Sequence, residues 1–130
     1  MTAKTDVPTY DQPPGNEGHV IIAGFGRFGQ IVGRVLSAQK ISFTALDISA
    51  DQVDFVKRYG AKIYYGDASR LDLLRAAKAE EARAFVLAID DVEASLATAE
   101  MVRKNFPRLE IYARARNRQH AYRLMDLGII

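Results

Sequence analysis

The chain has no cysteine, only two histidines and no long uninterrupted hydrophobic run. The absence of cysteine excludes disulfides, thiolate metal sites and a cysteine nucleophile. His19 and His120 are too few for a histidine-rich metal site. No stretch reaches the ~18 apolar residues that indicate a membrane-spanning helix. A net charge of +2 over 130 residues argues against broad nucleic-acid binding. The composition therefore predicts a single globular domain.

What the sequence does have is a glycine-rich turn between two regular elements. Residues 19–23 read as an apolar strand, and residues 24–29 then match the pattern G-x-G-x-x-G. In this pattern Gly24 permits the tight turn, Gly26 lets a phosphate approach the backbone, and Gly29 lets the helix pack close to the strand. The amides at the start of such a helix carry the positive end of its dipole. The turn therefore predicts a site for the phosphate of a nucleotide.

The residues around the turn support this interpretation. A helix over about 28–39 is predicted by apolar residues at helical spacing, namely Phe28, Ile31, Val32, Val35 and Leu36. A second strand at 42–47 ends on Asp47, at the distance from the first glycine that is typical of a carboxylate that binds ribose hydroxyls. The alternative is a ligand-free glycine turn, with Asp47 as an ordinary acid at the end of a strand.

Strand and helix patterns alternate along the rest of the chain. Residues 1–18 contain prolines and glycines and are predicted to be a flexible leader or linker, outside a domain that covers 19–130. Ser49 with Gln52 resembles a capping box and predicts a helix that stops at Gly60. The other expected elements are strands at 62–65, 84–89 and 110–114 and helices at about 71–77, 92–105 and 118–127.

This alternation predicts a doubly wound, Rossmann-like α/β fold with a parallel sheet in the order 3-2-1-4-5. Ile129 and Ile130 read as the opening of a truncated sixth strand, which suggests a piece of a longer polypeptide. Ligands of such folds lie at the carboxyl ends of the strands, where the strand order reverses. That rule selects the glycine turn, Asp47, the segment 66–68, the acids Asp90 and Asp91, and Arg114.

Three of these stretches, taken together, resemble the motifs of a known domain family. GFGRFGQ at the turn, YYGDASRLDLLRAA at 64–77 and IYARARN at 111–117 resemble the nucleotide-binding lobe of RCK, or TrkA-N, domains. The resemblance covers about residues 19–130 and is strongest to the cytoplasmic domains of Kef-type glutathione-gated potassium efflux antiporters. It implies a non-catalytic domain of a bacterial inner-membrane protein. Such a domain forms a homodimer beneath the transport domain of the same polypeptide, and an ancillary oxidoreductase subunit is a possible partner.

The resemblance also implies a ligand, AMP or NAD(H), and a set of contact residues. Asp47 would accept the two ribose hydroxyls and would repel a 2′-phosphate, which favours these ligands over NADP(H). The expected cofactor-binding residues are Gly24, Phe25, Gly26, Arg27, Phe28, Gly29, Asp47, Ile48, Asp67, Ala68, Asp90 and Arg114. Arg114, Arg116 and Asn117 are the expected contacts for glutathione, whose carboxylates suit arginine.

Most of these residues also have an alternative, purely structural interpretation. Arg27 is otherwise a solvated loop residue, and Asp67 serves nearby amides as a cap. Asp90 and Asp91 suit a helix N-terminus. Arg114 and Arg116 alternatively form an ion-pair network, Asn117 caps the last helix, His19 is structural and His120 lies at the surface or an interface. Two other functions remain open, a fragment of an NAD-dependent oxidoreductase and the RCK domain of a ligand-gated potassium channel.

Overall fold

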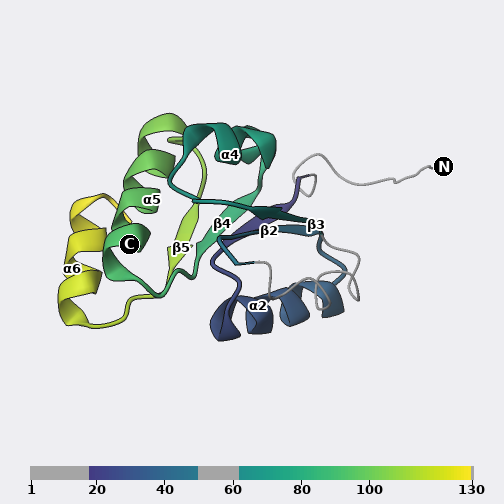
Figure 1. Ribbon diagram of the computed structural model, residues 1–130, viewed down its shortest axis with the longest axis horizontal. Coiled ribbons are helices and arrows are strands. Elements are labelled where there is room, and N and C mark those ends of the chain that lie inside the picture. The colour runs from purple at the N-terminus through teal and green to yellow at the C-terminus, as the bar shows by residue number, and fades with distance from the viewer. Residues whose placement is uncertain (1–17, 50–61, 130) are drawn as a thin grey trace.

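A computed structural model describes residues 18–49 and 62–129 of the chain. Its centre is a five-stranded parallel sheet in the order β3-β2-β1-β4-β5 (Figure 1), which confirms the predicted fold class. The strands are β1 (Val20–Ala23), β2 (Phe43–Asp47), β3 (Lys62–Tyr65), β4 (Ala84–Leu87) and β5 (Ile111–Ala113).

Helices cover both faces of this sheet. In Figure 1, α2 lies on one face, whereas α4 and α5 lie on the other, with α6 beside α5. None of the helices within the described ranges is long and apolar enough to cross a membrane. The leader expected at 1–18, apart from Gly18, and the helix expected before Gly60 lie outside the described residues. The helices are α2 (Arg27–Ala38), α4 (Leu71–Ala76), α5 (Val92–Asn105) and α6 (Arg118–Asp126), with a 3₁₀ turn η3 (Ala79–Glu81).

Strand β1 occupies the middle of the sheet because both of its faces are apolar. All four of its residues are buried. Ile21 and Ala23 belong to the core on the α4 and α5 side, and Val20 and Ile22 to the core on the α2 side. Each fully buried aliphatic side chain of this kind is worth about 1.5–3 kcal/mol relative to exposure. The strand is therefore a rigid base for the turn that follows it.

Parallel register aligns the carboxyl ends of the three central strands. Ala23 at the end of β1 pairs with Leu46 of β2 and with Leu87 of β4. Gly24, Asp47 and the residues after Leu87 consequently meet at one edge of the sheet, which we call the carboxyl edge. The candidate residues that were predicted from strand ends gather there.

Helix α2 contacts the sheet along a different line from the predicted apolar stripe. Phe28, Ile31 and Val35 are exposed, and the buried residues of the helix are Gly29 and Gly33. A Cβ at Gly33 would lie 3.0 Å from the ring of Phe43. The two glycines let the backbone of the helix approach the sheet closely, so the line of contact runs through them. The stripe is therefore split, with Val32 and Leu36 packed on the core.

Two smaller expectations concern the chain near its described ends. The Nε2 atom of His19 lies 2.7 Å from the carbonyl oxygen of Ala77, which agrees with a structural role. Ile129 lies in no strand. Its side chain is buried in the core and its amide donates to the carbonyl of Leu124. The expected opening of a sixth strand is thus not seen at Ile129, and Ile130 lies outside the described residues.

Candidate functional site

Two glycines of the turn are required by the fold itself. Gly24 has a φ of +91°, and a Cβ there would lie 2.7 Å from the backbone of Ala88. Its amide also donates to the carbonyl of Leu46 at 2.8 Å. A Cβ at Gly29 would collide with the carbonyl oxygen of Gly24. The turn is therefore clamped between β2 and β4, and these two positions have no room for a side chain.

Gly26 differs from its two neighbours in the motif. Its φ is −80°, a value that any residue adopts. It is exposed, and a Cβ added to it would meet only Asp90 Oδ2, at 4.0 Å, among the described atoms. Folding therefore does not demand a glycine at this position. Open space above the backbone is what the close approach of a ligand requires.

The start of α2 presents unsatisfied donors beside Gly26. The N-cap residue is Gly26 itself, which has no side chain to cap the helix, and the first turn has no acidic residue. Within the described part of the chain, the amides of Arg27, Phe28 and Gly29 find no acceptor. These amides lie at the positive end of the helix dipole. The arrangement suits an anion such as a phosphate group.

Asp47 is bonded to the same turn. Its Oδ2 accepts a hydrogen bond from the amide of Phe25 at 2.6 Å, and its Oδ1 accepts one from the amide of Ser49 at 2.8 Å. A carboxylate offers about four acceptor positions, so acceptor capacity remains for hydroxyl donors. The bond to Phe25 was not foreseen from the sequence, because it depends on how closely β2 approaches the turn. Asp47 is thus a support of the turn as well as a candidate ribose ligand.

The side chains of the turn have different environments. Phe25 is buried and its ring centroid lies 5.9 Å from that of Phe43, so only its backbone faces the site. Arg27 is exposed and makes no ion pair with the described residues. Ile48 is 81% exposed and follows Asp47 directly. An apolar side chain in such an exposed position is available to a flat apolar ligand surface.

Three charged residues join the glycine turn to the end of β5. Arg114 Nη1 lies 2.9 Å from Asp90 Oδ1, and Arg116 Nη1 lies 3.6 Å from the same oxygen and 3.2 Å from the Asp90 carbonyl. The guanidinium of Arg114 also lies 5.4 Å from the ring centroid of Phe28. These ion pairs are exposed, and such pairs contribute only about 0–1 kcal/mol. The ion-pair interpretation of the two arginines is therefore what the structure shows, and the pairs are weak enough to exchange partners.

The neighbouring polar residues divide between caps and open positions. Asp91 Oδ2 accepts a hydrogen bond from the amide of Ala94 and caps α5, whereas Asp90 does not act as a cap. Asn117 Oδ1 accepts one from the amide of His120 and caps α6, as the structural interpretation expected. A hollow of about 510 Å³ lies over these residues, and it is lined by Asp90, Asp91, Val92, Glu93, Arg116 and Asn117.

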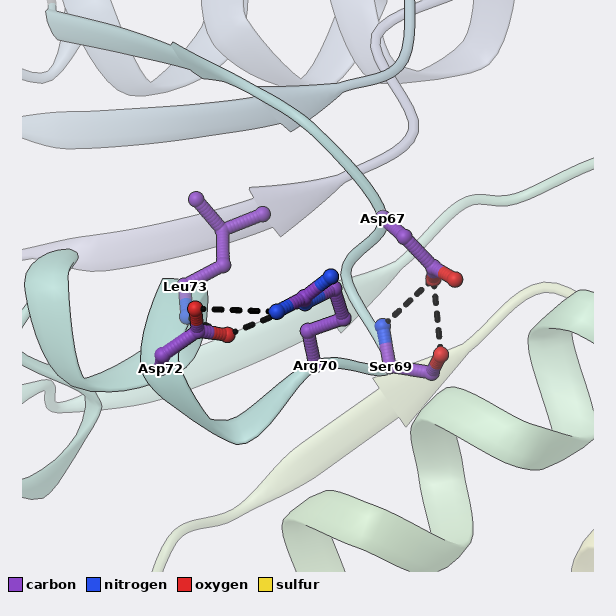
Figure 2. A network of polar contacts seen from close by, with 5 residues as sticks. All are labelled: Asp67, Ser69, Arg70, Asp72 and Leu73. Atoms are coloured by element: carbon purple, nitrogen blue, oxygen red, sulfur yellow. Dashed lines mark hydrogen bonds and ion pairs between the residues drawn. The ribbon is translucent and has the colours of Figure 1, made fainter.

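Asp67 stabilises the turn that precedes α4. Figure 2 shows its Oδ1 accepting hydrogen bonds from the amide and the hydroxyl of Ser69, at 2.9 and 2.7 Å. The bond from the amide, and then the bond from the hydroxyl, hold the pKa of the Asp67 carboxyl below its usual value. Arg70 pairs instead with Asp72, at 3.2 Å. Asp67 therefore serves the amide and the hydroxyl of Ser69 but does not cap α4, whose N-cap residue is Arg70. Ala68 beside it is buried.

His120 is buried within the domain, contrary to the expectation of a surface or interface position. Its side chain is 1% exposed and packs between α6 and α5. Nδ1 accepts a hydrogen bond from the amide of Arg116 at 2.9 Å, and Nε2 lies 3.1 Å from Ser95 Oγ. Burial, followed by the positive charges of Arg123 and Arg116, lowers the pKa of the ring, and Glu93 opposes this shift. Its spacing of four residues from buried Leu124 was the available sign of an inward position.

A larger cavity, of about 600 Å³, lies at the opposite edge of the sheet. Its lining includes Lys40, Thr44, Lys62 and Lys78 and none of the predicted site residues. The groups that the carboxyl edge offers around Gly26 are backbone donors and charged side chains.

A family profile covers nearly all of the residues that the structure describes. The profile of the TrkA-N domain matches residues 20–130. The chain belongs to the TrkA-N domain family. The family membership that the motifs indicated is thereby confirmed.

Curated relatives of the domain are potassium transport proteins. The chain is 46% identical over 110 residues to the glutathione-regulated potassium-efflux system protein KefC of Escherichia coli O139:H28. That match covers 85% of this chain and 18% of KefC. This TrkA-N domain therefore spans about a fifth of the length of the curated relatives that it matches.

Two of the solved structures similar to this domain contain a bound nucleotide. The Kef CTD of Shewanella denitrificans in AMP-bound form is 48% identical, with a TM-score of 0.78, over 86% of this chain and 67% of that chain. The TrkA-N domain of the inner membrane protein ybaL from Escherichia coli is 25% identical, with a TM-score of 0.80, over 86% and 83%. The GsuK channel bound to NAD shares the fold, at 21% identity and a TM-score of 0.77, over 96% of this chain and 23% of that chain.

Proposed function

We propose that this TrkA-N domain binds an adenine nucleotide, AMP or NAD(H), at the carboxyl edge. The observation that carries the proposal is the open backbone at Gly26, where the fold does not need a glycine, beside amides that find no acceptor among the described residues. Asp47 is fixed to the same turn and keeps acceptor capacity. The AMP-bound Kef CTD, at 48% identity, supports the same ligand class.

Each part of the nucleotide has a chemical partner in this proposal. The phosphate binds the amides at the start of α2, and the exposed guanidinium of Arg27 adds a charged donor. The ribose hydroxyls donate to Asp47. The adenine lies beside Ile48 and the segment Asp67–Ala68, where an exposed apolar side chain and a carboxylate are present. A 2′-phosphate would lie against the charge of Asp47, so NADP(H) is disfavoured.

The domain is regulatory in this proposal, and it is not an enzyme. It lies on the cytoplasmic side of a potassium/proton antiporter, as part of the same polypeptide, forms a homodimer and controls potassium efflux. The similarity to KefC, named as glutathione-regulated, supports this setting.

In the same proposal, glutathione binds Arg114 and Arg116 beside Asn117, next to the hollow at Asp90. Each ligand acts only through a difference in affinity between two conformations of the protein. An ancillary oxidoreductase subunit is a further partner to be tested.

Calorimetric titration of the chain with AMP, NAD, NADH and NADP tests the nucleotide site. We expect binding of AMP or NAD(H), exclusion of NADP, and loss of binding in Gly26→Ala, whose added methyl occupies the open space above the backbone. Ser37→Ala, near the far end of α2, is the matched control and should bind normally. Unchanged binding by Gly26→Ala would overturn the assignment. Hydride transfer to a substrate would instead favour the oxidoreductase interpretation.

A further inference from the structure

The hydrogen bonds of His120 fix the state of its ring. A backbone amide only donates, so the Nδ1 atom that receives the Arg116 amide at 2.9 Å carries no proton. The neutral ring therefore has its proton on Nε2, which donates to Ser95 Oγ at 3.1 Å. Ser95 is fully buried on α5. The ring thus joins the segment before α6 to the neighbouring helix, and it does so only while it is neutral.

The segment that the ring holds contains the two arginines of the carboxyl edge. Arg116 receives its only described backbone anchor from His120, and its side chain reaches the carbonyl and the carboxylate of Asp90. Arg114 lies two residues earlier and pairs with the same carboxylate. The next residue, Asn117, is fixed by its cap on α6. The position of the Arg116 backbone therefore depends on the imidazole.

Asp90 in turn faces the glycine turn. Its Oδ2 is the atom nearest to the open side of Gly26, at 4.0 Å from the position of an added Cβ. Arg114 and Arg116 pair with Oδ1 of the same carboxylate and offset its charge. Without them, an uncompensated negative charge would stand beside the turn and would repel an anion there.

We propose that neutral His120 is a positioning residue that holds Arg116, and with it Arg114, against Asp90, and that protonation of the ring releases this segment. A second ring proton sits on Nδ1 and opposes the N–H of Arg116, so the bond between them is lost. Loss of this hydrogen bond does not depend on a bound nucleotide. We also expect nucleotide binding to weaken in acid, because Asp90 would then be less well neutralised beside the turn; this second expectation rests on the proposed function.

The charged groups around the ring set the conditions for this change. Arg116 faces it from the loop, Arg123 from α6 and Glu93 from α5. Glu93 is itself paired with Arg123, at 2.8 Å. Burial and the two arginines disfavour a charged ring, whereas Glu93 favours it. Protonation therefore needs a pH below the usual pKa of histidine, and it costs the protein the bond to Arg116.

Nuclear magnetic resonance of the whole chain tests the proposal, because the chain has only two histidines. Between pH 7.5 and 5, we expect the Arg116 amide signal to titrate with the midpoint of the His120 ring. Exchange of this amide, corrected for its intrinsic pH dependence, should rise about fivefold in acid, the factor that one hydrogen bond is typically worth.

Two variants test whether His120, and not another titrating group, causes the acid response of the Arg116 amide. His120→Asn keeps an acceptor for the Arg116 amide but does not titrate, so the acid response should vanish. His19→Gln removes the other histidine, which bonds to Ala77, and should leave the response intact. Retention of the response in His120→Asn, or titration of the ring without movement of the Arg116 signal, would overturn the proposal. Since these readouts contain no nucleotide, they fail independently of the nucleotide site.

Discussion

The Oδ2 atom of Asp47 lies 2.6 Å from the amide nitrogen of Phe25, so the last side chain of β2 holds the backbone of the glycine turn. Asp47 therefore contributes in two ways. It stabilises the turn, and it can accept a hydrogen bond from a hydroxyl of a ligand. Substitutions at this position should therefore affect stability and ligand binding together.

Asp47→Ala should abolish binding of AMP and lower the free energy of unfolding by about 1.5–3 kcal/mol, the range for hydrogen bonds to a charged group. Asp47→Asn keeps an acceptor oxygen for one backbone amide and should lose less stability. Urea denaturation and calorimetry measure the two effects. An Asp47→Ala protein with the affinity of the wild type would show that the nucleotide does not contact this edge of β2.

Gly24→Ala and Gly26→Ala should behave in opposite ways. The first puts a Cβ 2.7 Å from the backbone of Ala88 at a φ of +91°, so it should cost about 2 kcal/mol or more. The second has space for the methyl and should change stability by no more than about 0.5 kcal/mol. Thermal denaturation compares them. Equal destabilisation by both substitutions would contradict the distinction between fold and ligand glycines.

Asp90→Asn should leave the free energy of unfolding within about 1 kcal/mol of the wild type, because its ion pairs with Arg114 and Arg116 are exposed. It frees both guanidinium groups and removes a negative charge next to Gly26. We therefore expect tighter binding of AMP and of glutathione in calorimetric titrations at low salt. Asp72→Asn, which breaks the exposed pair with Arg70, is the control and should bind as the wild type does.

The hydrogen bonds from Ser69 give a pH prediction for Asp67. They hold the pKa of this carboxyl below its value in the unfolded chain. Its contribution to stability is therefore complete above the usual pKa of aspartate, about 4, and is lost as the pH falls through the folded value. Ser69→Ala removes the hydroxyl and should raise the pKa of Asp67, measured from its carboxyl ¹³C shift. An unchanged titration in this variant would contradict the role of the hydroxyl.

Much of the fold was predictable because its signals are local. The apolar run of β1, the glycine turn and the repeated strand and helix patterns lie within short segments, and the handedness rule then sets the strand order. The line of contact of α2 was not predictable in this way. Gly29 and Gly33 draw the helix backbone toward the sheet, so Phe28 is left exposed although its spacing suggested a stripe.

The site was predicted as a set of residues but not as a set of bonds. Strand ends identified Asp47, Asp90 and Arg114 correctly as neighbours at one edge. The bonds between Asp47 and the turn, and between His120 and Arg116, join residues whose distance is fixed only by the packed sheet and helices. The spacing of His120 from Leu124 indicates that the ring faces inward, but no spacing in the sequence identifies the atoms to which it bonds.

The packing of Gly24 against Ala88 determines when the turn can be completed during synthesis of the chain. The amide of Ala88 donates to Ala23, and its backbone forms the wall against Gly24. Ala88 follows β4, which leaves the ribosome long after β1, α2 and β2. Before β4 is synthesised, β1 can pair only with β2, so it is an edge strand and the turn has no wall on the β4 side. The proposed nucleotide site is therefore complete only after β4 has joined the sheet.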